Sequence, residues 1–268
     1  MDVVVLVKYV PDAQEPRSLG GQAWRLDRTG ETGRLSELDE YAVEVALRLV
    51  EEHGGSVRAL TVGPEEAAQA LRTALQMGAD EALHVCDPAL AGGDALATAR
   101  LLAAALERLR PDLVVTGMSS TDAATGLVPA AVAELSGWAL LAQADQVEAE
   151  GHDGAWTLRI ERDAGGAVAT LEASAPVVLS VTDRSGEPRY PSFRTIMAAK
   201  KKRVQRWGPE EVTGAGGLVS PDLVGQAGAR TRVLSARPLP ARAASRRMVA
   251  PAEAPAAIAD LLHELELL

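Results

Sequence analysis

Small, hydroxyl-bearing and glycine residues follow a strand-like run in the segment TGMSSTDAATG, residues 116–126. The preceding DLVVTG at 112–117 has the composition of a strand buried on both faces. Pro129 suits the first turn of a following helix, and we predict that Thr125 caps that helix. Backbone N–H groups and the positive helix end then meet at the carboxyl edge of a parallel sheet, where anionic ligands bind. The spacing therefore predicts a turn that holds a phosphate, with an ordinary small-residue connection as the alternative.

Other sequence motifs that indicate nucleotide binding, catalysis or metal binding are missing from the sequence. The segment above is neither a Walker P-loop nor a GxGxxG sequence, and without GxSxG its Ser119 and Ser120 are not expected to act as nucleophiles. The single cysteine, Cys86, excludes a disulfide framework and a CxxC redox pair. The four histidines lack metal-ligand spacing: His53, His84, His152 and His263. We predict neither a metal site nor acid–base or covalent catalysis.

A second candidate site is the segment EPRYPSFRTIMAAKKKR at residues 187–203. It holds the only phenylalanine of the chain, Phe193, and three of its four lysines, Lys200, Lys201 and Lys202. Two prolines stiffen its first half, and its second half is compatible with a helix. A solvated surface loop is the alternative. In an acidic chain that otherwise uses arginine, the lysine run and an exposed aromatic favour a docking element for a protein partner.

Composition limits the classes of protein to which the chain can belong. Its 268 residues include 27 Lys and Arg against 37 Asp and Glu, so the net charge is 27 − 37 = −10. This balance disfavours a general nucleic-acid binder, which needs a surplus of cations. No run approaches 18 apolar residues, and Met1-Asp2 leads straight into a strand-like VVVLV without a basic leader. Together with the single cysteine, these features predict a soluble, cytoplasmic protein with no direct membrane insertion.

Strand-like and helix-like segments alternate through the first 140 residues. The strand-like segments are VVVLV, VRALTV, ALHV and DLVVTG, at 3–7, 57–62, 82–85 and 112–117. Helices are predicted between them, from a capping-box start at Ser36 and Asp39, after Pro64, and from Asp94 to Leu109. Alternation at this spacing is typical of an α/β fold with a mainly parallel sheet and helices on both faces.

Two parts of the chain depart from this alternation. The polar stretch 11–35 is long for a connection, so it is either functional or contains a small hairpin. After about residue 140, three strand-like segments follow one another without helices, WTLRI, AVATLEA and PVVLSVT, at 156–160, 167–173 and 176–182. We predict that they are antiparallel strands at the sheet edge.

We divide the chain into an α/β domain, residues 1–204, and a C-terminal arm, residues 205–268. Gly, Pro, Arg and Ala dominate the arm to about residue 250 with little periodicity, so we predict that it is extended. An amphipathic helix should close it, with its apolar face formed by Ile258, Leu261, Leu262 and Leu265.

Six blocks of the sequence match one known family collinearly over most of the chain. They are VLVKYVPD at 5–12, the helix from Glu40 to Leu49, TVGPEEAAQALRTALQMGADEALHV at 61–85, DLVVTG at 112–117, AELSGW at 133–138 and EPRYPSFRTIMAAKKK at 187–202. The most specific are LRTALQMGAD at 71–80 and the last block. On these residues the sequence strongly resembles the β subunit of electron transfer flavoproteins.

The resemblance implies an electron carrier subunit without bond-breaking catalysis of its own. In that family an α subunit holds most of an FAD, and the arm of the β subunit docks on it. The heterodimer carries electrons from dehydrogenases, such as acyl-CoA dehydrogenases of fatty acid β-oxidation, to a quinone reductase. The β subunit has an adenine nucleotide-binding, Rossmann-like fold and buries a structural AMP.

The resemblance also assigns a cofactor-binding set to this sequence. Its members lie at strand ends, at the start of the first helix and in the predicted phosphate turn: Leu6, Ser36, Leu38, Asp39, Val62, Gly117, Ser120, Asp122, Thr125, Gly126, Leu127 and Val128. Some positions depart from the family pattern. Ser119 and Ala124 replace a common Gln and Asp, and neither Ala13 nor Leu38 supplies the aromatic ring often found near the flavin.

The last block corresponds to the partner-recognition loop of the family, residues 187–202. The docking residues implied are Tyr190, Phe193, Ile196, Met197, Lys200, Lys201 and Lys202. Phe193 stands at the hydrophobic anchor, which is usually Leu, so the partner's pocket should differ in shape.

Three other functions remain open. Some relatives belong to flavin-bifurcating or nitrogen-fixation-linked complexes, in which FAD can replace AMP. A nucleotide-binding sensor of the universal-stress type shares the α/β core but leaves residues 187–202 and the arm unexplained. An adenylating enzyme of the pyrophosphatase type needs an SGGxDS-like loop after the first strand, and YVPDAQ at 9–14 differs from it.

Overall fold

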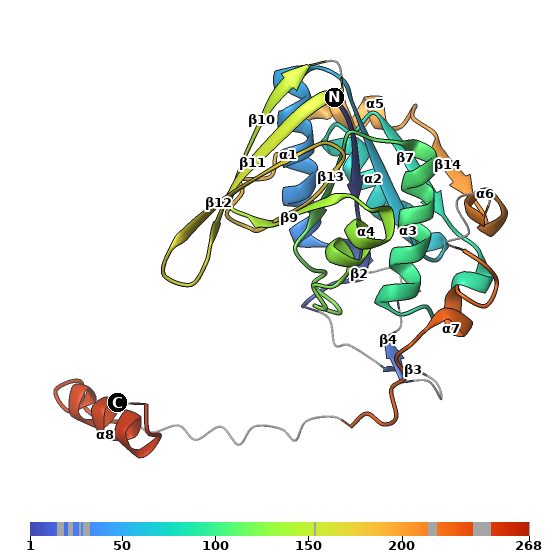
Figure 1. Cartoon of the computed structure of the whole chain (residues 1–268). Coiled ribbons are helices and arrows are strands. Elements are labelled where there is room, and N and C mark those ends of the chain that lie inside the picture. Colours follow the sequence, from blue (N-terminus) through green and yellow to red (C-terminus); the bar gives the residue numbers. More distant parts are fainter. Residues whose placement is uncertain are drawn as a thin grey trace. The chain divides into compact units, whose positions relative to one another are not determined.

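The computed structural model describes residues 1–14, 19–20, 24–26, 28, 33–152, 154–213, 219–237 and 248–267. The chain divides into two compact units, Met1–Leu234 and Ser235–Leu268, of which the first holds the sheets. Figure 1 shows the elements of both units. Among the described residues, no helix is both long and apolar enough to cross a membrane.

Seven strands within the described residues form one parallel sheet, in the order β14-β7-β6-β1-β8-β13-β9 (Figure 1). Their bounds are β1 Asp2–Leu6, β6 Ser56–Val62, β7 Glu81–Val85, β8 Leu113–Gly117, β9 Ala139–Ala144, β13 Val177–Val181 and β14 Val204–Trp207. The interior strands β1, β8 and β13 are mostly apolar, as expected where both faces of a sheet are covered.

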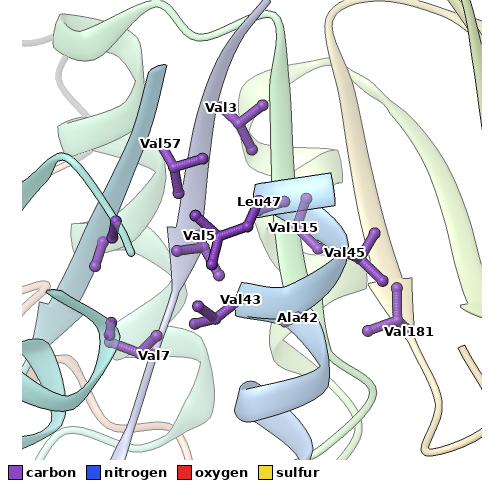
Figure 2. Close-up of a cluster of buried hydrophobic side chains, with 14 of the residues drawn as sticks. Val3, Val5, Val7, Ala42, Val43, Val45, Leu47, Val57, Val115 and Val181 are labelled. Carbon is purple, nitrogen blue, oxygen red and sulfur yellow. The ribbon is translucent and has the colours of Figure 1, made fainter. Parts of the chain in front are cut away.

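Each face of the sheet has its own core. Val3 and Val5 of β1 pack with α1 (Glu37–His53) and α2 (Ala68–Met77), and Figure 2 shows these valines beside Leu47 of α1. Val4 and Leu6 point to the opposite face, where α3 (Ala95–Leu109) and α4 (Val128–Ser136) pack. The predicted α/β fold, with a parallel sheet covered on both faces, is confirmed.

The prediction for the segments after residue 140 is wrong in part. PVVLSVT forms β13, an interior parallel strand between β8 and β9, rather than an antiparallel edge strand. All five residues of β13 are buried, which suits the interior of a parallel sheet. Three other strands form a separate antiparallel sheet: β10 Gln146–His152, β11 Ala155–Asp163 and β12 Val168–Ser174. Only one face of that sheet is covered, so its strands alternate buried and exposed residues.

The stretch after β1 contains the predicted hairpin geometry. Within its described residues, β2 (Tyr9–Pro11) pairs antiparallel with β5 (Gly33–Leu35), and β3 (Leu19–Gly20) pairs with β4 (Arg25–Leu26). The remaining short helices are η1 Glu65–Ala67, η2 Pro88–Leu90, α5 Phe193–Ala199, α6 Pro209–Thr213 and α7 Gly225–Gly228.

Residues beyond 204 also contact the main sheet and α3. β14 pairs in parallel with β7 and so belongs to the main sheet. The carboxylate of Asp94 caps α3, as predicted, and also accepts the N–H groups of Arg230 and Thr231. The first unit therefore extends to Leu234. The second contains the predicted terminal helix, α8 (Ala254–Glu264), and residues 238–247 of the predicted arm lie outside the described residues.

Candidate functional site

The order of the central strands creates a switch point in the sheet. From β1 the chain passes to β6 and β7 on one side, and then crosses to β8 on the other side of β1. The crossover connections after β1 and β8 therefore leave in opposite directions, toward α1 and α4 on opposite faces. In open α/β sheets, ligands bind at this place, outside the carboxyl ends of the strands.

A buried carboxylate joins three elements at the switch point. Asp39 of α1 accepts the backbone N–H of Lys8, just after β1, at 2.8 Å, and also that of Gly117 at the end of β8. Burial raises the pKa of Asp39 to about 7, although these two donors lower it. A Cβ atom on Gly117 would lie 2.7 Å from Asp39 Oδ1, so only glycine fits there.

The side chains at the start of α1 do not form the predicted capping box. Ser36 is the N-cap residue, but its side chain makes no hydrogen bond to the helix. Its Oγ instead accepts the N–H of Thr121 at 3.4 Å, and the Asp39 carboxylate is used by Lys8 and Gly117. Both side chains accept N–H groups from segments that follow β1 and β8 or end β8, and so they tie α1 to the sheet edge.

Two cations converge on a second buried carboxylate. Lys8 Nζ lies 2.8 Å from Asp122 Oδ1, and Arg28 Nε donates to Asp122 Oδ2 at 2.7 Å. Lys8 Nζ also donates to Ser120 Oγ at 3.1 Å. Burial raises the pKa of Asp122, but the charges of Lys8 and Arg28 outweigh it, and the pKa falls to about 2. Burial lowers the pKa of Lys8. We call Lys8, Arg28, Asp39, Ser120 and Asp122 the switch-point cluster.

The structure brings much of the predicted cofactor-binding set to this edge. Leu6 ends β1 and is paired with Thr116 of β8, while the carbonyl of Leu38 faces Gly117. Val62 ends the neighbouring strand β6. The binding roles of these residues stay predictions.

The turn after β8 differs from the prediction in one respect. α4 begins at Val128 with Leu127 as its N-cap residue, so Thr125 does not cap it. Ala124 and Gly126 have φ angles of 47° and 61°, which carry the chain through an exposed turn before the helix. The left-handed backbone at Gly126 is the position at which glycine is favoured.

Sequence reasoning missed Lys8 and Arg28 as members of the site. Lys8 is the single lysine outside the run at 200–202, and this rarity was its only signal. Arg28 lies within the polar stretch 11–35, which gave no sign of the residue that it contacts. Their partner, Asp122, is more than ninety residues away in sequence.

The second candidate site is an exposed segment around α5. Tyr190 is 94% exposed and Phe193 80% exposed, as an anchor requires, and Met197 is also exposed. Ile196 is half-buried, whereas Lys200 and Lys201 are exposed. Lys202 differs from Lys200 and Lys201, because its Nζ donates to the carbonyl of Ala79 at 2.7 Å. The predicted exposure of Phe193 is confirmed, and its docking role stays a prediction.

The fold and the switch-point cluster define an α/β domain of the class that places its polar site where the strand order reverses. Comparison with known proteins adds the family. The family description "Electron transfer flavoprotein domain" matches residues 23–212. Electron transfer flavoprotein subunit beta of Mycobacterium bovis is 42% identical over 253 residues, 92% of each chain. The subunit of the same name from Thermoanaerobacterium thermosaccharolyticum is 36% identical over 76% of each chain.

A third relative, protein FixA of Azorhizobium caulinodans, is 31% identical over 84% of this chain and 83% of its own. These matches cover most of the chain. The chain belongs to the electron transfer flavoprotein family, within which it is similar to the beta subunits.

Replacing Asp122 with Asn should destabilise the protein at neutral pH by on the order of 2 kcal/mol, because Lys8 and Arg28 lose their charged partner. The folded-state pKa of Asp122, about 2, lies below the ordinary value of 3.8. The contribution of the Asp122 carboxylate to the free energy of unfolding is therefore present above pH 4 and is lost as the pH falls toward 2. Urea unfolding of both proteins at several pH values measures the difference between their free energies of unfolding.

Asp163→Asn is the matched control, because Asp163 is exposed and accepts the N–H of Gly165. Equal stabilities of wild type and Asp122→Asn at pH 7 would show that the cluster does not hold the sheet edge together.

Proposed function

We propose that this chain is the beta subunit of a heterodimeric electron carrier. In the complete carrier, an alpha subunit holds most of an FAD, which supplies the redox chemistry. The heterodimer accepts electrons from a dehydrogenase, such as an acyl-CoA dehydrogenase, and passes them to a quinone reductase. Family membership over most of the chain supports this role.

The switch-point cluster is the observation that carries the proposal for this subunit, namely that it binds a structural AMP. Lys8 and Arg28 face one strongly ionised carboxylate, Asp122, while the pKa of Asp39 lies near neutrality. Protonation of Asp39 thus leaves the cluster with a net positive charge, which suits a phosphate. Lys8 keeps 37% of its side chain exposed and is available to a ligand.

The turn after β8 offers further donors for the phosphate. The N–H groups of Thr125, Gly126 and Leu127 make no hydrogen bond to any described residue of the chain. They precede α4, whose N-terminal end favours negative charge. Main-chain donors do not depend on side-chain identity, so the departures at Ser119 and Ala124 are compatible with this role.

The terminal helix supports a partner subunit. Ile258 and Leu261 of α8 and its C-cap residue Leu265 expose 58%, 49% and 56% of their surface within the chain. Burying such side chains against an alpha subunit removes apolar surface from water and stabilises the heterodimer. The proposed docking of a dehydrogenase uses a different surface, the segment around Phe193.

A beta-type subunit of a flavin-bifurcating or nitrogen-fixation-linked complex is the second candidate function. The similarity to protein FixA favours it, although the identity of 31% is lower than the 42% shared with the beta subunit of Mycobacterium bovis. Nucleotide content separates the two, because two FAD molecules would occupy such a heterodimer.

Expression of the chain alone should give a colourless protein, and coexpression with its alpha subunit a yellow heterodimer. The reason is that most FAD contacts come from the alpha subunit. Extraction of the purified heterodimer followed by chromatography should yield one FAD and one AMP. Stoichiometric FAD on the isolated chain would contradict the proposal that the alpha subunit holds most of the FAD. Two FAD molecules per heterodimer would favour the second candidate function.

Replacing Lys8 with Met should lower the AMP content of the heterodimer while FAD is retained. A charge-assisted hydrogen bond contributes about 1.5 to 3 kcal/mol, so AMP should bind roughly ten- to a hundredfold more weakly. Equilibrium dialysis with AMP, after removal of bound nucleotide, measures the change. Lys201→Met, at an exposed position outside the cluster, should leave binding unchanged. An unaltered affinity of Lys8→Met for AMP would show that the cluster is not part of the nucleotide site.

Replacing Phe193 with Ala should raise the KM of the cognate dehydrogenase for the carrier by roughly ten- to a hundredfold. Burial of a Phe side chain contributes about 1.5 to 3 kcal/mol to binding. Thermal stability should stay the same, because Phe193 is 80% exposed in the chain itself. Val168→Ala, at another exposed apolar residue, serves as control. An unchanged KM, or a large loss of thermal stability, would refute the docking role.

A further inference from the structure

The segment that carries Phe193 is fastened to α1 at its beginning. The guanidinium of Arg189 reaches two carboxylates of that helix. Arg189 Nε donates to Glu44 Oε2 at 2.7 Å, and Nη2 donates to Glu44 Oε1 at 2.9 Å and to Glu51 Oε2 at 3.0 Å. The backbone N–H of Arg189 adds a bond to Glu44 Oε2 at 3.1 Å. One arginine therefore connects the start of the segment to two turns of α1.

The chemistry of this contact makes it stronger than an ordinary surface ion pair. Glu44 and Glu51 are seven residues apart (51 − 44 = 7), which places both on one face of α1. Glu44 is 16% exposed and Arg189 31%, so solvent screens their pairing only in part. The hydrogen bonds to Glu51 and Glu44 raise the pKa of Arg189, and the bond from Arg189 lowers the pKa of Glu51. The planar fork of arginine fixes an orientation as well as a distance.

The segment is also fastened at its end, this time to α2. Arg72 Nη1 donates to the carbonyls of Ala199 at 3.3 Å and Lys202 at 2.8 Å. The bond to Ala199 places a cation on the last carbonyl of α5, an acceptor that the helix leaves open. Lys202 Nζ donates in turn to the carbonyl of Ala79. Ala199 is buried against the core that α1 and α2 share.

The exposed apolar side chains lie between these two fastenings. Tyr190 directly follows Arg189, and Phe193 begins α5, where the Oγ of Ser192 accepts the N–H of Thr195 at 3.2 Å. Phe193 is exposed, whereas the Arg189 side chain is engaged with α1. The anchor and the fastening therefore belong to one short segment but serve different surfaces.

We propose that Arg189 is a positioning residue, whose clamp on Glu44 and Glu51 holds the docking segment in its partner-binding geometry before the partner arrives. The inference rests on the proposed docking role of Phe193. A segment ordered in advance loses less conformational entropy on binding, so the partner binds it more tightly. The clamp acts through the segment and does not touch the partner.

The test replaces Arg189 with Gln in the coexpressed heterodimer. We expect the KM of the cognate dehydrogenase for the carrier to rise about three- to thirtyfold, with kcat unchanged. Hydrogen exchange of the amides at 190–199 should become at least about tenfold faster, because local opening is no longer opposed by the clamp. FAD and AMP content and the melting temperature should stay close to those of the wild type.

Two further variants make the experiment decisive. Arg159→Gln breaks another Arg–Glu pair, with Glu172 between β11 and β12, and should leave KM and exchange at 190–199 unchanged. Glu51→Gln removes only the exposed half of the clamp and should give a smaller effect in the same direction if Arg189→Gln fails to fold.

The outcomes separate this inference from the docking role itself. A raised KM for Phe193→Ala together with wild-type KM and exchange for Arg189→Gln would overturn the clamp alone. Wild-type KM for Phe193→Ala would overturn the docking role, whatever Arg189→Gln does. Loss of bound nucleotide or a lowered kcat in Arg189→Gln would show a general structural role and would also contradict the inference.

Discussion

The burial of charge where β1 and β8 end is the constraint on which the site depends. Asp39 is buried, so its carboxylate needs the N–H groups of Lys8 and Gly117. Meeting that need fixes α1 against the ends of two neighbouring strands. It also excludes any side chain at position 117, because a Cβ atom would collide with the Asp39 carboxylate and with the carbonyl of Leu38. The contacts that pack α1 on the sheet are therefore the same contacts that set the geometry of the site.

The same helix connects the two candidate sites. At its first turn, Asp39 belongs to the switch-point cluster, and further along the helix Glu44 and Glu51 hold Arg189. Between these positions, Val43, Val45 and Leu47 belong to the same buried cluster as valines of β1, β8 and β13, which Figure 2 shows, so this part of α1 is packed against the sheet. The proposed nucleotide site and the proposed docking segment therefore share one helix.

The sequence predicted the features that depend on local pattern. Buried strands appeared as apolar runs, Asp94 was identified as a helix cap, and the rarity of Phe193 and of lysine drew attention to the exposed segment around α5. Features that depend on residues far apart in the sequence could not be predicted from local pattern. The apolar run of β13 gives no sign of its neighbours, so its parallel pairing with β8 was missed. Likewise, nothing near Lys8 or Arg28 in the sequence indicates that both contact Asp122.

We propose that the switch-point cluster is the nucleotide site of a beta subunit. A crystal structure of the coexpressed heterodimer, purified without added nucleotide, tests it most directly. We expect electron density for an adenine nucleotide at the carboxyl edge between β1 and β8, with its phosphate against the turn at 118–127 and within hydrogen-bond distance of Lys8 Nζ. A nucleotide bound elsewhere on the subunit, or a cluster in which Lys8 contacts only Ser120 and Asp122, would contradict it.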